Sequence, residues 1–170
     1  SDVQRFDVFE FLPGGEIGRW RGRAWALLVR RLLSVVDALA QLHDAGWVHG
    51  DLKSSNVLLD ADGRAWLADF GSARRKGEST TAGASPYSVS PERLDGAPAS
   101  PSDDIYAFGV LLYELIGGHP PFYPDITPER VRHEPPPPLS GRPMPPEPLR
   151  ELVARCLDKE PAKRPATMHE

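Results

Sequence analysis

Two short polar clusters follow each other in the chain, His49-Gly50-Asp51-Leu52-Lys53-Ser54-Ser55-Asn56 and Asp69-Phe70-Gly71. Between them, apolar stretches at 56–59 and 64–68 flank the segment Asp60-Ala61-Asp62-Gly63. An Asp-Gly pair favours the positive backbone angles of a tight turn. We therefore expect a small β-hairpin, which would bring the two polar clusters together at its open end.

The clusters combine two carboxylates, an ammonium group and a side-chain amide, supplied by Asp51, Asp69, Lys53 and Asn56. Hard oxygen ligands suit Mg²⁺, a fixed cation suits phosphate oxygens, and a second carboxylate can accept a hydroxyl proton. The pattern therefore predicts phosphoryl transfer from a Mg²⁺-nucleotide complex.

The first cluster resembles the catalytic loop of protein kinases, His-x-Asp-Leu-Lys-x-x-Asn, and the second resembles their Asp-Phe-Gly metal loop. The resemblance implies ATP and Mg²⁺ (or Mn²⁺) as cofactors. It makes Asp51 the base that orients the acceptor hydroxyl and Lys53 the cation beside the transferring phosphoryl group. Asn56 and Asp69 would be the metal ligands and, with Lys53, would contact the nucleotide. His49 is expected to pack and hydrogen-bond within the loop.

Downstream segments resemble the same family. Residues 84–92 are similar to the end of the kinase activation segment, with Ser-Pro-Glu in place of Ala-Pro-Glu. Asp104 corresponds to the aspartate of the central kinase helix, which is expected to hold the backbone of the catalytic loop. Residues 156–165 resemble a late kinase signature whose arginine pairs with the glutamate of Ala-Pro-Glu. The resemblance therefore implies a buried ion pair between Glu92 and Arg164.

The first residues, Asp7-Val8-Phe9-Glu10-Phe11-Leu12-Pro13-Gly14-Gly15, resemble the last strand of the small kinase lobe running into the hinge. The hinge backbone of kinases holds the adenine. The resemblance therefore implies that Glu10, Phe11 and Leu12 line the adenine edge of the nucleotide site, with Phe9 at the gatekeeper position.

Taken together, the chain is expected to be a partial protein kinase domain over residues 1–170. The last small-lobe strand and hinge would occupy 1–15, the catalytic loop 47–56 and the activation segment 69–92. The glycine-rich loop, the strand lysine and its partner glutamate are missing from the sequence. We therefore expect a truncated α+β kinase fold that lacks most of the N-terminal lobe, and a fragment that is inactive alone.

Apolar periodicity predicts that this C-terminal lobe is mainly α-helical. Apolar residues recur at three- and four-residue steps from Trp25 to Leu42, and this helix should end near Ala45, before Gly46. Two more helices are expected at 102–116 and 147–157. Twelve of the 19 prolines lie between residues 120 and 148, which predicts an irregular surface segment. Three tryptophans are expected in the core: Trp25, Trp47 and Trp66.

Composition restricts the possible partners. With 20 basic against 24 acidic residues the net charge is −4, so nothing indicates a nucleic-acid or anionic-membrane surface. No apolar run approaches the roughly 20 residues that span a bilayer. A lone cysteine, Cys156, points to a reducing compartment. We expect a cytoplasmic protein, or the cytosolic part of a larger or membrane-tethered one, and the usage of Ala, Arg and Pro favours a bacterial source.

The Asp-Leu-Lys-x-x-Asn pattern resembles serine/threonine kinases, so the expected partners are ATP and a protein with an acceptor Ser or Thr. In many kinases an arginine at the position of Gly50 binds the phosphate of a phosphorylated activation loop. We therefore expect that phosphorylation at 79–81 is not needed to switch this protein on.

Two alternatives remain open. A pseudokinase or regulatory scaffold would keep the fold without the reaction. His-Gly-Asp also occurs in small-molecule phosphotransferases of the aminoglycoside and choline type, although Lys53 and Phe70-Gly71 depart from their pattern.

Overall fold

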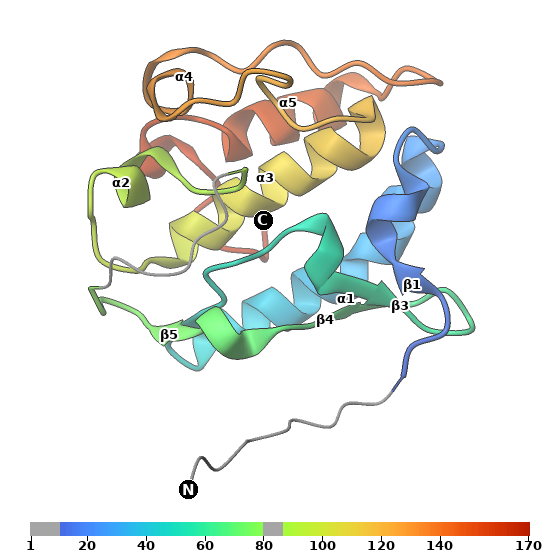
Figure 1. Cartoon of the computed structure of the whole chain (residues 1–170), viewed down its shortest axis with the longest axis horizontal. Helices are drawn as coiled ribbons and strands as arrows, with labels where there is room; N and C mark the ends of the chain where they lie inside the picture. The colour runs from blue at the N-terminus through green and yellow to red at the C-terminus, as the bar shows by residue number, and fades with distance from the viewer. Residues whose placement is uncertain (1–10, 80–86) are drawn as a thin grey trace, which may run out of the picture.

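The structure of the chain is a computed structural model that describes residues 11–79 and 87–170. Figure 1 shows helices packed around one central helix, with short strands along one side. The helices are α1 (Trp25–Asp44), α2 (Pro91–Leu94), α3 (Pro101–Gly117), α4 (Pro128–His133) and α5 (Glu147–Cys156). The strands are β1 (Gly15–Glu16), β2 (Trp47–Val48), β3 (Val57–Leu59), β4 (Ala65–Leu67) and β5 (Arg74–Arg75).

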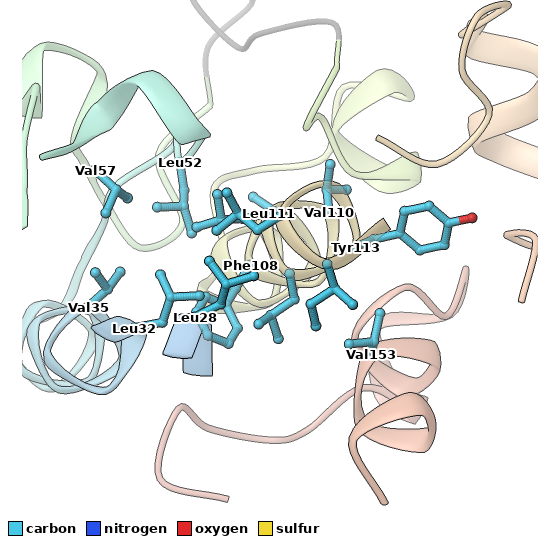
Figure 2. Close-up of a cluster of buried hydrophobic side chains, with 14 of the residues drawn as sticks. Leu28, Leu32, Val35, Leu52, Val57, Phe108, Val110, Leu111, Tyr113 and Val153 are labelled. Carbon is cyan, nitrogen blue, oxygen red and sulfur yellow. The ribbon is translucent and has the colours of Figure 1, made fainter. Parts of the chain in front are cut away.

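Helix α3 is the centre of the hydrophobic core and lies between α1 and α5 (Figure 1). Almost every side chain from Asp103 to Ile116 is buried, so this helix is apolar nearly all round, as expected for a helix enclosed on several sides. Figure 2 shows Leu28 and Leu32 of α1 lying beside Phe108 of α3. Burying such side chains contributes about 1.5–3 kcal/mol each.

The ends of the two long helices are set by local chemistry. At the start of α3, the Ser100 and Asp103 side chains form a capping box, and Pro101 occupies the first helical turn. At its end, Gly118 adopts a left-handed conformation with φ 90°. Helix α1 is followed by Gly46 with φ +81°. The helices predicted near 25–45, 102–116 and 147–157 are thus confirmed.

The predicted hairpin is also confirmed, since β3 and β4 pair antiparallel with Val57 opposite Leu67. Three further strands were not predicted: β1 pairs with β3, and β2 pairs with β5. Each is only two residues long, which is too short to produce a periodic pattern in the sequence. The first pair attaches the segment before α1 to the hairpin. The second attaches the segment after the hairpin to the residues that follow α1.

Two expectations about the surface and core are wrong in part. The proline-rich segment is not wholly irregular or superficial, because it contains α4 and buries Phe122, Val131 and Leu139 in the main core. Trp66 is 46% exposed, since side chains alternate along β4 and Ala65 takes the buried side. Trp25 and Trp47 are partly buried, and Trp25 packs against the core as expected.

Within residues 11–79 and 87–170, no helix combines the length and the apolar character that crossing a membrane requires. Cys156 is buried, and burial raises the pKa of its thiol to about 12.

Candidate active site

The hairpin places the two polar clusters next to each other. The last paired residues are Val57 and Leu67, and beyond them the Ala68 amide donates to the Asn56 carbonyl oxygen at 2.9 Å. Asp69 follows directly. The residue that ends the first cluster and the residue that begins the second therefore flank the same end of the hairpin, as the sequence predicted.

Asp51 is at the centre of a compact polar group. Its carboxylate is buried and lies 2.6 Å from Lys53 Nζ. Asn56 Nδ2 donates to Asp51 Oδ2 at 3.2 Å and to the Asp51 carbonyl oxygen at 2.8 Å. The structure thus brings together Asp51, Lys53 and Asn56, and the two donors hold the carboxylate in one orientation.

The same hydrogen bonds fix the orientation of the Asn56 amide. Because Nδ2 donates to a backbone carbonyl, which can only accept, Oδ1 is directed elsewhere. Oδ1 accepts a long hydrogen bond from Ser55 Oγ at 3.4 Å. An amide oxygen presented in this way is a suitable ligand for a hard cation.

Asp69 presents its carboxylate from the other loop. Its backbone is left-handed, with φ 62°, and Oδ1 accepts from the Gly71 amide at 3.3 Å. In the described part of the chain, no three His, Cys, Asp or Glu side chains are grouped so that they could hold a metal ion. A donor set of Asn56 and Asp69 fits Mg²⁺ when phosphate oxygens and water supply the remaining ligands.

Asp104 fixes the backbone of the loop that carries Asp51. Its carboxylate, on the first turn of α3, is 1% exposed. Oδ2 accepts from the His49 amide at 2.7 Å and Oδ1 from the Gly50 amide at 2.9 Å, and His43 Nε2 lies 2.9 Å from Oδ2. The expectation that Asp104 holds this loop by hydrogen bonds is confirmed.

His49 is a packing and hydrogen-bonding residue, as predicted. Its side chain is fully buried, and Nδ1 accepts from the Asp51 amide at 3.3 Å. Nε2 therefore carries the proton and donates to the Ala68 carbonyl at 3.1 Å. The imidazole also meets the Phe70 ring edge-on, with 5.2 Å between centroids. The His49 ring therefore links the two loops.

Glu92 and Arg164 form the predicted ion pair. The contact is bidentate, with 2.6 Å from Nη1 to Oε1 and 2.8 Å from Nη2 to Oε2, and the guanidinium is fully buried. Nη1 also donates to the carbonyl of Ser102 in the first turn of α3. The guanidinium lies 4.9 Å from the centroid of the Tyr106 ring, and burial raises the pKa of that phenol to about 12.

The expected adenine edge is described only in part. Phe11 is 84% exposed and Leu12 partly exposed, whereas Glu10 and the gatekeeper position Phe9 lie outside the described residues. The hinge-like segment is attached to the hairpin, because the Gly14 amide donates to the Leu59 carbonyl at 2.9 Å. A Cβ at Gly14 would lie 2.6 Å from that oxygen, so this close approach requires glycine.

The expected activation segment is also incomplete, since residues 80–86 lie outside the described ranges, and Ser79 is exposed. The sequence motifs do not predict a second polar group, beside the loop that carries Asp51, in which Arg21 and Ser54 contact Glu114. A signal was present: Glu114 is a single acid among the apolar residues of 105–116.

The core is helical and centred on α3. At one end of the hairpin, one loop carries Asp51, Lys53 and Asn56, and the other carries Asp69. This is the arrangement of a phosphotransferase of the kinase class. The family model described as "Protein kinase domain" matches residues 8–170. The chain belongs to the protein kinase domain family.

Named relatives are serine/threonine-protein kinases from bacteria and animals. The chain is 40% identical to PkaA of Streptomyces coelicolor over 78% of its own length and 26% of the relative's. It is 32% identical to pkn3 of Myxococcus xanthus, over 98% and 35% of the two lengths. It is 33% identical to PAK mbt of Drosophila melanogaster, over 92% and 26%. The chain thus spans about a quarter to a third of these relatives.

The fold is similar to a solved structure, the PK-1 kinase of the Cydia pomonella granulovirus. The TM-score is 0.82 at 23% identity, covering 94% of this chain and 64% of the other.

Proposed function

We propose that the chain is the hinge and large-lobe part of a serine/threonine protein kinase, which transfers the γ-phosphoryl group of ATP to Ser or Thr hydroxyls of a protein. One observation carries this proposal. The Asp51 carboxylate is held by Lys53 and Asn56, on a loop fixed to the core by Asp104 and adjacent to Asp69. We further propose the boundaries 1–15 for strand and hinge, 47–56 for the catalytic loop and 69–92 for the activation segment.

In this proposal each polar group has one task. Asp51 accepts a hydrogen bond from the acceptor hydroxyl and takes its proton as the new oxygen–phosphorus bond forms and ADP leaves. Lys53 neutralises charge on the transferring group. The Asn56 amide oxygen and the Asp69 carboxylate hold Mg²⁺, which supplies positive charge to the phosphate oxygens. The residues that line the adenine edge of the nucleotide site are Glu10, Phe11 and Leu12.

The catalytic groups of the small lobe are part of the proposal as well. The strand lysine and helix glutamate that hold the α- and β-phosphates in kinases have no counterpart in this sequence, nor does the glycine-rich loop. We therefore expect the 170 residues alone to show no phosphotransfer, and the activity to belong to the complete protein, working in the cytoplasm on a protein substrate.

The test is γ-phosphate transfer by the full-length protein, with wild type beside Asp51→Asn and Asp69→Asn. A generic protein acceptor and an aminoglycoside are offered in parallel. We expect label on Ser or Thr of the protein, and a loss of about 10²–10⁴-fold in both variants. Asp62→Asn serves as the matched control, because Asp62 is an exposed acid at the opposite end of the same hairpin.

The outcomes separate the alternatives. Label on the aminoglycoside would assign the small-molecule phosphotransferase class. Transfer that survives in Asp51→Asn would overturn the role of Asp51 as the base. No transfer from the complete protein while it still binds ATP would overturn the proposal and favour a regulatory scaffold.

A further inference from the structure

A cavity of about 660 Å³ opens beside the catalytic loop. Its walls come from the loop itself, from the second half of α3 and from the segment that follows α3. Lys53, which contacts the Asp51 carboxylate, lines this cavity. A polypeptide whose hydroxyl group reaches Asp51 would therefore place its neighbouring residues here.

A carboxylate lies in this cavity and is already paired. The Glu114 side chain is 13% exposed, and a carboxylate so enclosed requires a hydrogen-bonding or charged partner. Arg21 Nε donates to Glu114 Oε1 at 2.5 Å, and Ser54 Oγ donates to the same oxygen at 3.1 Å. Arg21 Nη2 in turn donates to Ser54 Oγ at 2.9 Å. The three side chains thus form a closed group.

The charges around the cavity balance. Of the described residues that line it, four are charged: Glu16, Arg21, Lys53 and Glu114. Two are acids and two are bases, and Lys53 and Glu114 each have an oppositely charged partner in the chain. A cationic side chain entering the cavity would find the enclosed carboxylate, Glu114, already paired. The other acid of the lining, Glu16, is exposed, so a pair with it would be worth little.

The uncharged lining combines three serines, Ser54, Ser55 and Ser88, with aromatic and apolar side chains. Tyr87 and Tyr123 are 63% and 60% exposed, and the His119 ring is stacked on Tyr123 with 5.7 Å between centroids. Leu52 and Val110 lie behind these rings in the wall of the cavity and are themselves buried. Exposed aromatic rings beside apolar side chains are a favourable contact surface for uncharged side chains.

We infer, resting on the proposed function, that this cavity seats the acceptor polypeptide and that Arg21 determines its specificity. By neutralising Glu114 within the chain, Arg21 directs the site toward acceptors whose neighbouring residue is apolar or aromatic, and away from those with arginine or lysine there.

The test uses the full-length protein and peptides with one acceptor Ser, in which one neighbouring position at a time carries Leu, Tyr or Arg. For wild type we expect the higher kcat/KM with Leu or Tyr. Arg21→Ala leaves Glu114 without its cation, so the ratio of Arg to Leu peptides should rise about tenfold or more. The change should appear in KM, and also in the Kd of peptides that carry Ala in place of the acceptor Ser.

Three further variants isolate the cause. Arg21→Lys keeps a cation and should keep the wild-type preference. Arg21→Ala combined with Glu114→Gln should lose the arginine preference gained by the single variant. Arg23→Ala removes an exposed arginine two positions away, which lies over the Trp20 ring, and should leave the ratio unchanged.

Different results would overturn the role of Arg21 and the proposed kinase function. Asp51-dependent transfer with the same peptide preference in wild type and Arg21→Ala would overturn the role of Arg21 alone. A wild-type preference for arginine would also overturn it. Absence of Asp51-dependent transfer to any peptide would overturn both.

Discussion

The two ends of the polar site differ in how they are held, although one hairpin joins them. In the loop before β3, His49, Asp51 and Asn56 are 0%, 7% and 6% exposed. After β4, Asp69 is exposed and Phe70 is 51% exposed. The loop before β3 therefore belongs to the core, and the loop after β4 lies at the surface of the described structure.

The difference follows from the partners of each loop. The first loop hydrogen-bonds to Asp104 on the central helix and buries Leu52 completely. Asp69, by contrast, accepts a hydrogen bond from the nearby Gly71 amide. The comparison indicates that the position of Asp51 is set by folding, and we expect that of Asp69 to depend more on what binds over it. Three predictions test this difference, and a fourth concerns the closed end of the hairpin.

The largest expected effect is at the base of the buried loop, where Arg164 fixes the first turn of α3. Arg164→Ala leaves the Glu92 carboxylate without its bidentate partner and should lower the free energy of unfolding by about 3–5 kcal/mol. Urea denaturation measures this change. Arg155→Ala is the control, because its pair with Glu170 is about half exposed and should be worth less than about 1 kcal/mol.

Matched substitutions at Asp104 and Asp69 address the comparison directly. Asp104→Asn replaces one of two accepting oxygens with an amide N–H₂ that faces the backbone donors of His49 or Gly50, so stability should fall by about 1–3 kcal/mol. Asp69→Asn, at an exposed site, should change stability by less than about 0.5 kcal/mol. Phosphotransfer by the full-length protein should fall in both. Equal stability losses would contradict the distinction between the two loops.

Gly50 tests how tightly the buried loop is packed against the exposed one. Its φ is +77°, and an added Cβ would lie 3.0 Å from the Ser72 carbonyl oxygen. Gly46 has a similar φ of +81° and nothing within 4 Å of the added atom. Gly46→Ala should therefore cost about 1 kcal/mol from backbone strain alone, and Gly50→Ala should cost more. Urea midpoints of the two variants give the difference, and equal midpoints would show that the loops are not in tight contact.

The sequence predicted the buried loop better than its surroundings, for physical reasons. Periodicity and turn chemistry predict the hairpin and the three long helices. Motifs with fixed spacing predict the hydrogen bonds of Asp104 and the ion pair of Glu92 with Arg164. The expectation that Trp66 lies in the core is wrong, because a strand of three residues is too short for its sequence to reveal which face is buried. Arg21 and Glu114 are 93 positions apart, and only folding brings them together.

The smallest effect is expected at the closed end of the hairpin, far from both loops. Asp60 accepts from the Trp66 indole at 2.9 Å and from backbone amides of the turn, and these hydrogen bonds lower the pKa of its carboxyl below the usual 3.8. A lowered native pKa means that the unfolded chain takes up the proton first as the pH falls, so this contribution to stability is present above about pH 4 and is lost below it. Asp60→Asn cannot titrate. The difference in urea midpoint between wild type and Asp60→Asn should therefore shrink from pH 5 to pH 3, but only slightly because the carboxylate is partly exposed to solvent. A difference that grows over this interval would mean that the turn is held by something other than the ionised carboxylate.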